Sequence, residues 1–400
     1  MRELGEHLRH YAAEYNAAVH RHFFATVPQA RQVFPHSAQS THPQLAPAVA
    51  WVLENLEEGS LPPAVAERLR ELGLGHRRHG FPAEIYPEFA RSLLAGLEVL
   101  GLTTYQHQIA ARTIKECCRI MQDAAHAADV AGQAPAYSAQ VVAVERPNRR
   151  TAVIRVESGA QIEYLPGQHF QVTSQLTPGT WRELTPANPS DPTGQMEFHL
   201  AITGEGSQLL STAQPGDWWT LGTPAGTPPA ITPGTTLISF GTGWAAARAL
   251  LLDQLARGAA LDDVHLVTVA PSPGKHYDTE TQANLAALAP QLRVTQVVRE
   301  AQDPWLLGAQ PPAAGFAPIV AEDPMQPVLA AGTQRRFVLV GPADRVEVAR
   351  ASLLAGGVDA QTITKESWQR GHEWAASAAE LDGWENWEAW AEWKKSQWAE

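Results

Sequence analysis

The spacing of apolar residues changes twice along the chain, and these changes limit the folds that its 400 residues can adopt. Up to about residue 131, apolar residues recur every three or four positions, as at Val65 and Leu69, a spacing that predicts helices. Between about 136 and 230, short alternating runs broken by Pro and Gly predict strands. After Pro233, apolar strand-like runs alternate with helical stretches, which favours a parallel sheet.

These patterns predict a multidomain chain, because a single hydrophobic core rarely grows past about 250 residues. The expected order is an all-α domain, an antiparallel β-barrel domain and an α/β domain with a parallel, nucleotide-binding sheet, followed by an acidic tail rich in Trp. We place these parts at residues 1–133, 136–230, 233–370 and 371–400.

The tail carries Trp384, Trp387, Trp390 and Trp393, which recur every third residue. On a helix of about 3.6 residues per turn this spacing produces a broad aromatic stripe. We therefore expect a helix that packs on its own protein. The alternative is a helix that docks on a partner or a membrane, and the surrounding acidic residues count against the membrane.

Composition excludes several classes of partner. The formal net charge is -12 and no run of Lys or Arg forms a basic stripe, so neither nucleic acid nor an anionic membrane surface is expected to bind. We expect no stable membrane insertion, because no stretch of about 18 apolar residues occurs, and no secretory signal opens the chain. The adjacent Cys117 and Cys118 suit a reducing, cytoplasmic setting.

The first domain holds ten histidines, and spacing alone would single out none of them. His76, however, ends a predicted helix and is followed by Gly80, by Tyr86 and by a Leu-Leu pair. This string resembles the proximal haem region of flavohaemoglobins. The upstream VPQARQVFP is similar to the segment in which that family carries its haem-stacking phenylalanine, here Phe34, and ten residues later Gln44 takes the place of the distal glutamine.

The resemblance implies that the all-α domain is a globin that binds haem b through His76, since haem iron in a globin takes one proximal imidazole. Tyr86 and Asp123 would hydrogen-bond around that imidazole and increase its electron donation. Gln44 and His20 would contact a distal ligand. His20 replaces the family's tyrosine, and an imidazole there could donate a hydrogen bond to the ligand or move to the iron and block it.

Three strings in the second domain resemble the flavin-binding segments of the same family. The first is a Tyr-Leu-Pro-Gly-Gln string, the second is Arg-Glu-Leu-Thr, and the third is a Gly-x-x-Ser turn that would lie over the diphosphate. In the second string Leu184 replaces an aromatic residue that stacks on the flavin, which predicts weaker binding or a changed potential. The resemblance implies bound FAD, with contacts from Tyr164, Gln168, Arg182, Thr185, Gly206 and Ser207.

The third domain begins with a strand, a Gly-rich turn and a helix, a geometry that places a pyrophosphate against a helix N-terminus. The turn contains Gly241, Thr242 and Gly243 and is similar to the family's nicotinamide loop, with Trp244 in place of a small or polar residue. The resemblance implies that NAD(P)H binds here. NADH and NADPH both remain open, since Arg299 is as readily a surface residue as a 2′-phosphate contact.

Two later strings complete the resemblance. A strand ends in Gly341 and Pro342, similar to the family's Cys-Gly-Pro, with Val340 in the cysteine's place. The string Glu-Ser-Trp that ends at Trp368 is similar to the family's C-terminal Glu-x-Phe, so Trp368 would cover the flavin face that nicotinamide displaces.

The resemblance runs in family order to about residue 370 and implies a nitric oxide dioxygenase. Electrons from NAD(P)H would pass through FAD to haem, and nitric oxide and O2 would become nitrate. The replacements at His20, Leu184 and Val340 leave two alternatives open. One is a haem-based ligand or redox sensor with slow turnover, and the other is a flavohaem oxidoreductase that uses a non-nicotinamide donor.

Overall fold

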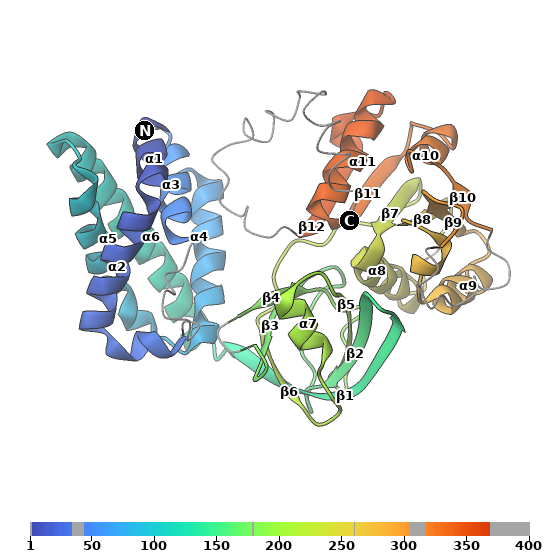
Figure 1. Ribbon diagram of the computed structural model, residues 1–400, viewed down its shortest axis with the longest axis horizontal. Helices are drawn as coiled ribbons and strands as arrows, with labels where there is room; N and C mark the ends of the chain where they lie inside the picture. Colours follow the sequence, from blue (N-terminus) through green and yellow to red (C-terminus); the bar gives the residue numbers. More distant parts are fainter. Residues whose placement is uncertain (1, 34–43, 178–179, 260, 304–316, 369–400) are drawn as a thin grey trace. The chain divides into compact units, whose positions relative to one another are not determined.

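The computed structural model describes residues 2–33, 44–177, 180–259, 261–303 and 317–368. Contacts divide the chain into two compact units that meet in the sequence between Pro135 and Ala136 (Figure 1). The first unit is built from helices, and the second holds two six-stranded sheets. The predicted fold class, an all-α region followed by an antiparallel barrel and a parallel sheet, is confirmed.

The helices of the first unit surround one hydrophobic core. Those that the structure describes are α1 (Arg2–His10), α2 (Ala12–Thr26), α3 (Leu45–Glu54), α4 (Pro63–His76), α5 (Tyr86–Leu97) and α6 (Thr104–Val130). A capping box starts α6, because the Thr103 hydroxyl accepts from the backbone N–H of Gln106 and the Gln106 side chain accepts from that of Thr103. At Gly73, α4 crosses α6 so closely that a Cβ would lie 2.5 Å from the carbonyl oxygen of Met121.

Both cysteines lie on α6 as free thiols. Burial raises the pKa of Cys117 and of Cys118 to about 12, and for Cys117 the neighbouring Cys118 and Glu116 add to the effect. Both thiols are therefore neutral at ordinary pH. None of the described helices combines the length and the apolar character that crossing a membrane requires.

The first sheet of the second unit is antiparallel and nearly closed. Its strands are β1 (Ala136–Asn148), β2 (Thr151–Glu157), β3 (Phe170–Ser174), β4 (Arg182–Leu184), β5 (Gln195–Ala201) and β6 (Trp218–Gly222), in the order β4-β3-β6-β1-β2-β5. A bridge between Pro186 and Phe198 joins the two edges, which makes the sheet a barrel. Phe170, Phe198 and Trp219 fill its interior, and α7 (Glu205–Ser211) follows β5.

The second sheet is parallel throughout, in the order β10-β9-β8-β7-β11-β12. Its strands are β7 (Thr235–Phe240), β8 (His265–Ala270), β9 (Arg293–Val298), β10 (Ile319–Val320), β11 (Arg336–Pro342) and β12 (Ile363–Trp368). The helices between them are α8 (Trp244–Ala256), α9 (Thr279–Leu288), α10 (Gln326–Ala330) and α11 (Ala343–Ala355).

Helices cover both faces of the parallel sheet. Leu237 of β7 shares a core with α8 and α9, whereas its neighbour Ile238 shares the opposite core with α10 and α11. All six residues of β7 are buried, as expected for a strand covered on both sides. Val153 of β2 also belongs to the core under α8, so barrel and parallel sheet are joined by apolar packing.

Candidate functional site

The proposed iron ligand and its expected partner lie together in the helical unit. His76 is the last residue of α4 and Tyr86 the first of α5, and Gly80 turns the chain between them at φ +78°. The Tyr86 hydroxyl lies 3.5 Å from Nδ1 of His76. Burial, with a smaller contribution from Cys118, raises the pKa of Tyr86, so its hydroxyl stays protonated. With Nδ1 turned to Tyr86, Nε2 is the nitrogen that a haem iron would take.

Asp123 does not join this pair. Its carboxylate accepts from Nη1 of Arg119 at 2.8 Å, and its side chain is 62% exposed. The buried face of α6 carries Cys118, Met121 and Ala125, and two residues along a helix from Met121 is the opposite side. The expectation that Asp123 bonds to His76 is therefore wrong, because the helix turns this carboxylate to solvent.

His20 is buried on α2 with a defined hydrogen bond. Its Nδ1 lies 2.6 Å from the carbonyl oxygen of Asn16, which can only accept, so Nδ1 carries the proton. Burial lowers the pKa of His20 and the bond to Asn16 opposes this only in part, so the ring is neutral. In this tautomer Nε2 is an acceptor, which means that it could ligate a metal but could not donate a hydrogen bond to a distal ligand.

The residues expected beside His20 are only partly described. The side-chain oxygen of Asn16 accepts from the backbone N–H of Ala46 at 2.9 Å. This bond joins the helical turn that carries His20 to the start of α3, two residues after the half-buried Gln44. Gln44 and His20 therefore lie on segments that are tied together. Phe34, the expected stacking residue, lies outside the described residues.

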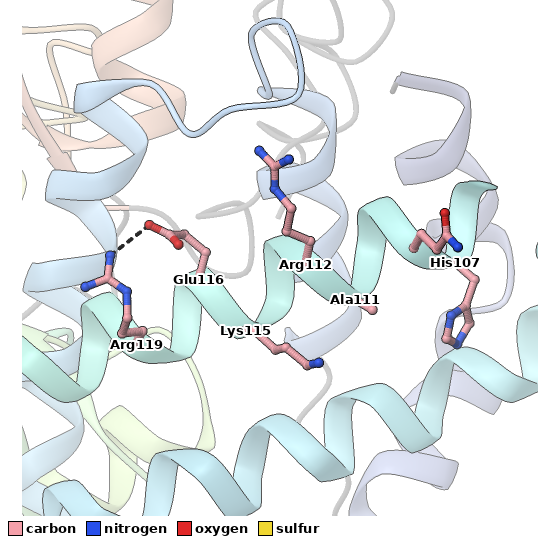
Figure 2. Close-up of a pocket in the computed structure, with 7 residues that line it drawn as sticks. His107, Ala111, Arg112, Lys115, Glu116 and Arg119 are labelled. Atoms are coloured by element: carbon pink, nitrogen blue, oxygen red, sulfur yellow. Dashed lines mark hydrogen bonds and ion pairs between the residues drawn. The ribbon is translucent and has the colours of Figure 1, made fainter. Parts of the chain in front are cut away.

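An open hollow of about 500 Å³ lies elsewhere on the helical unit. Figure 2 shows it along α6, where Glu116 and Arg119 form an ion pair of 2.8 Å. Among the described residues, those that line the hollow are His107, Gln108, Ala111, Arg112, Lys115, Glu116 and Arg119. They include none of the predicted haem contacts and most are exposed, so we do not place the haem there.

In the second unit, Arg182, the predicted diphosphate contact, lies against the loop that leads into α7. A Cβ on Gly206 would overlap the guanidinium of Arg182, so the side chain of β4 rests directly on the start of α7. The Ser207 hydroxyl accepts from the backbone N–H groups of Thr203 and Gly204 at 2.9 and 3.0 Å, which shapes the loop. A guanidinium beside close backbone fits a diphosphate, and Ser207 holds the loop in place.

The other predicted flavin contacts lie around the barrel edge. The Tyr164 hydroxyl donates to the carbonyl of Asn188 at 2.9 Å. Gln168 accepts from the N–H of Leu165 and donates to the carbonyl of Gly226, so its side chain holds a loop. Thr185 follows β4 and is half-buried. Leu184 packs into the barrel core beside Phe170 and is only 9% exposed. Its side chain therefore cannot stack on a flavin as the aromatic residue of the family would.

Glycines at the predicted nicotinamide site allow two chain segments to touch. A Cβ on Gly243 would overlap the carbonyl of Val340, and one on Gly341 would lie 2.9 Å from Cβ of Phe240. Gly241 has a φ of +53° and open space where a side chain would stand. The turn after β7 therefore packs tightly on the end of β11 and is open on its other side, which fits a pyrophosphate. Thr242 is buried in this turn.

The end of β12 meets the same edge of the sheet. Trp368 is in register with Pro342, and Glu366 is in register with Val340. Burial raises the pKa of Glu366 to about 7, so this carboxyl can hold a proton near neutral pH. Val340 is fully buried and presents no sulfur or polar atom, unlike the cysteine it replaces.

A polar cluster between barrel and parallel sheet was not predicted. Glu197 and His199 of β5 meet Arg248 of α8, and Tyr277 bonds to His199. Arg248 lies 51 residues from Glu197 in the sequence. Short-range sequence patterns do not predict contacts over such separations. The one local signal was Trp244, an unexpected large residue, whose indole N–H donates to Asp278 at 2.7 Å.

Residues 139–228 match the oxidoreductase FAD-binding domain family. No curated protein sequence matches the chain. The crystal structure of a flavohemoglobin from Malassezia yamatoensis with bound FAD and heme is similar over 91% of this chain and 98% of that chain, at 15% identity and a TM-score of 0.65. The chain has the architecture of a flavohaemoglobin.

Two further structures are similar over a smaller share of this chain. The FAD/NAD-binding domain of nitric oxide dioxygenase from Vibrio cholerae O1 biovar El Tor is 18% identical over 58% of this chain and 98% of its own, with a TM-score of 0.45. A ferredoxin NADP+ reductase from Neisseria gonorrhoeae with bound FAD and NADP is 17% identical over 58% of this chain and 99% of its own, with a TM-score of 0.48.

Proposed function

We propose that this flavohaemoglobin-like chain is an NAD(P)H-dependent flavohaem oxidoreductase of the nitric oxide dioxygenase class. The observation that carries the proposal is the contact of 3.5 Å between the Tyr86 hydroxyl and Nδ1 of His76 in the helical unit. The same chain also matches the oxidoreductase FAD-binding domain family. The proposed small-molecule ligands are O2, nitric oxide and a nicotinamide cofactor. The free thiols of Cys117 and Cys118 agree with a reducing compartment, and cytoplasm remains our prediction.

The bound groups would supply the redox chemistry, with hydride acceptance by FAD and ligand chemistry at the iron of haem b. The residues of this chain bind and orient them. Tyr86 orients the His76 imidazole and, when its hydroxyl oxygen accepts a hydrogen bond from Nδ1–H, increases the electron donation of the ligand. Arg182 neutralises a diphosphate, and Gly243 and Gly341 let nicotinamide nucleotide approach the sheet edge.

One observation favours a second candidate, a haem-based ligand or redox sensor with slow turnover. His20 presents an unprotonated Nε2 as a neutral, buried imidazole. Imidazole nitrogen is a good ligand for haem iron, so His20 could occupy the distal position that a dioxygenase keeps open for O2. A partner for the Trp-rich tail, residues 371–400, belongs to this candidate and remains a prediction.

The visible spectrum of the purified protein under air, before and after NADH and then nitric oxide, separates these candidates. The dioxygenase proposal expects flavin and Soret bands together, rapid haem reduction by NADH and consumption of nitric oxide over many turnovers. Both bands without reduction over minutes would favour the sensor. Flavin reduction only by some other donor would favour the non-nicotinamide alternative.

A substitution tests the ligand assignment independently. The variant His76→Ala should lose haem but keep flavin, because the proximal imidazole supplies the protein's bond to iron. The variant His126→Ala, at an exposed histidine of α6, is the matched control and should keep both. An unchanged Soret band in His76→Ala would remove the basis for the proposal.

A further inference from the structure

A chain of polar contacts crosses from the barrel to the parallel sheet within the second unit. Its centre is the Glu197 carboxylate on β5, with a side chain only 12% exposed. The carboxylate accepts from Nε of Arg155 at 2.7 Å and from Nη1 of Arg248 on α8, and it lies 3.0 Å from Nε2 of His199. A charged group of the barrel is thus bonded directly to the first helix of the nucleotide-binding sheet.

The same network continues on the far side of His199. The His199 side chain is fully buried, and its Nδ1 lies 2.9 Å from the Tyr277 hydroxyl. The next residue, Asp278, accepts from Nε1 of Trp244 at 2.7 Å and lies 3.7 Å from Nη1 of Arg248. Both ring nitrogens of His199 therefore have partners, and the loop before α9 is tied to β5 and to α8.

The Glu197 carboxylate stays ionised within the network. Burial opposes ionisation of Glu197, but the hydrogen bond from His199 and the charges of Arg248 and Arg155 outweigh it and hold the pKa of Glu197 well below its usual range. Glu197 is therefore a carboxylate at every ordinary pH, and it remains the fixed acceptor for three donors. A buried ion pair with several hydrogen bonds holds its geometry tightly, because removing one partner leaves an uncompensated charge.

The network lies between the segments that adjoin the two predicted cofactor loops. β5 leads within a few residues into the loop where Gly206 meets Arg182, the candidate diphosphate cradle. Trp244 and Arg248 lie in the first two turns of α8, which starts directly after the Gly241–Gly243 turn. The network thus joins the element that leads to the flavin loop with the element that follows the Gly241–Gly243 turn.

We propose that the Glu197–Arg248 pair, with His199, Tyr277, Trp244 and Asp278, is a clamp that positions the nicotinamide loop relative to the flavin loop for hydride transfer. This inference rests on the proposed function. The residues are positioning residues, since none belongs to a predicted cofactor contact. Hydride transfer requires close, aligned partners, and a misplacement of about 1 Å can lower such a rate by about 100-fold.

The test uses the full chain loaded with FAD. In Arg248→Met we expect the flavin content to be unchanged and the KM for NADH to stay within about threefold of the wild-type value. The hydride-transfer rate in stopped-flow measurements should fall at least tenfold, as expected when the two reacting groups are misplaced. The primary isotope effect with deuterated NADH should change as well. Glu197→Gln should lower the rate as well, and the double variant should lose less than the product of the two single losses, since both substitutions remove the Glu197–Arg248 contact.

The matched control is Arg335→Met. Arg335 pairs with Asp263 at 2.7 Å in the same sheet, but beside the start of β7 rather than its end. This variant should keep the rate and the isotope effect. If Arg248→Met does not fold, Trp244→Phe removes the bond to Asp278 together with part of a buried side chain, and it should lower the hydride-transfer rate by a smaller factor, about threefold to tenfold.

Two outcomes would overturn the proposal. In the first, Arg248→Met unfolds at a lower temperature than the wild type but transfers hydride at the wild-type rate and with the wild-type isotope effect. The network would then have a structural role only. The second applies if the wild-type protein does not oxidise nicotinamide, which refutes the proposed function. The clamp is then judged by hydrogen exchange, and it is refuted if Arg248→Met speeds amide exchange in β5 and α8 no more than Arg335→Met does.

Discussion

Glu366 makes the stability of the second unit depend on pH in a defined direction. Burial raises its pKa from the ordinary 4.5 to about 7, so the folded chain binds this proton more tightly than the unfolded chain. The stability that the proton contributes is complete below pH 4.5 and is lost as the pH rises through about 7. Above that range the folded state holds a half-buried carboxylate that the unfolded state would solvate better.

The magnitude follows from the size of the rise. One pKa unit corresponds to about 1.4 kcal/mol, so a change from 4.5 to about 7 is worth at most about 3.5 kcal/mol of unfolding free energy. Glu366 is only half-buried, and water reduces this to about 1–2 kcal/mol. The variant Glu366→Gln cannot ionise, so relative to wild type it should gain about 1–2 kcal/mol of stability between pH 5 and pH 8.

The assay is urea unfolding of wild type and Glu366→Gln at pH 5, 6, 7 and 8, followed by far-ultraviolet circular dichroism. The difference between the two proteins cancels the titration of other groups, such as His265 and His276. The control is Glu347→Gln. Glu347 lies on α11 and pairs at the surface with Lys365 of β12, so this variant should show no such trend. An equal difference between wild type and Glu366→Gln at all four pH values would refute the reasoning.

Three further predictions concern the individual sites. Tyr86→Phe should keep haem but lower the iron–histidine stretching frequency in resonance Raman spectra, because the ligand loses its partner at Nδ1; an unchanged frequency would contradict a role for Tyr86. Gly243→Ala should weaken nicotinamide binding at least tenfold by calorimetry, because its Cβ would overlap the Val340 carbonyl. Gly241→Ala meets open space and costs only the strain of positive φ, about 1 kcal/mol, so equal losses would argue against the steric reason. Arg182→Gln should raise the dissociation constant for FAD about tenfold or more, as expected for a lost charge-assisted bond of about 1.5–3 kcal/mol, in a fluorescence titration.

Local sequence order predicted several contacts between residues that are close in the chain. Gly80 and Tyr86 follow His76 at the spacing of the family, and the structure brings Tyr86 to the imidazole because the intervening turn is short. The same holds for the loop around Gly206 and for the Gly241–Gly243 turn, whose glycines meet neighbouring segments closely.

The error at Asp123 came from matching a motif without its helical phase. The buried positions of α6 include Ile114, Cys118, Met121 and Ala125, at spacings of three and four. Asp123 lies between two of them in sequence and therefore on the other side of the helix. The periodicity of α6 already contained the information needed to exclude it.

The sequence by itself determined the order of the three regions and supplied the local strings from which the haem, flavin and nicotinamide sites are predicted, because hydrophobic period and turn residues act over a few positions. Only the tertiary structure decided the tautomer of His20, the pKa of Glu366 and the partners of Glu197. Each depends on burial or on a contact with a distant segment. Folding creates such contacts, and no short-range pattern encodes them.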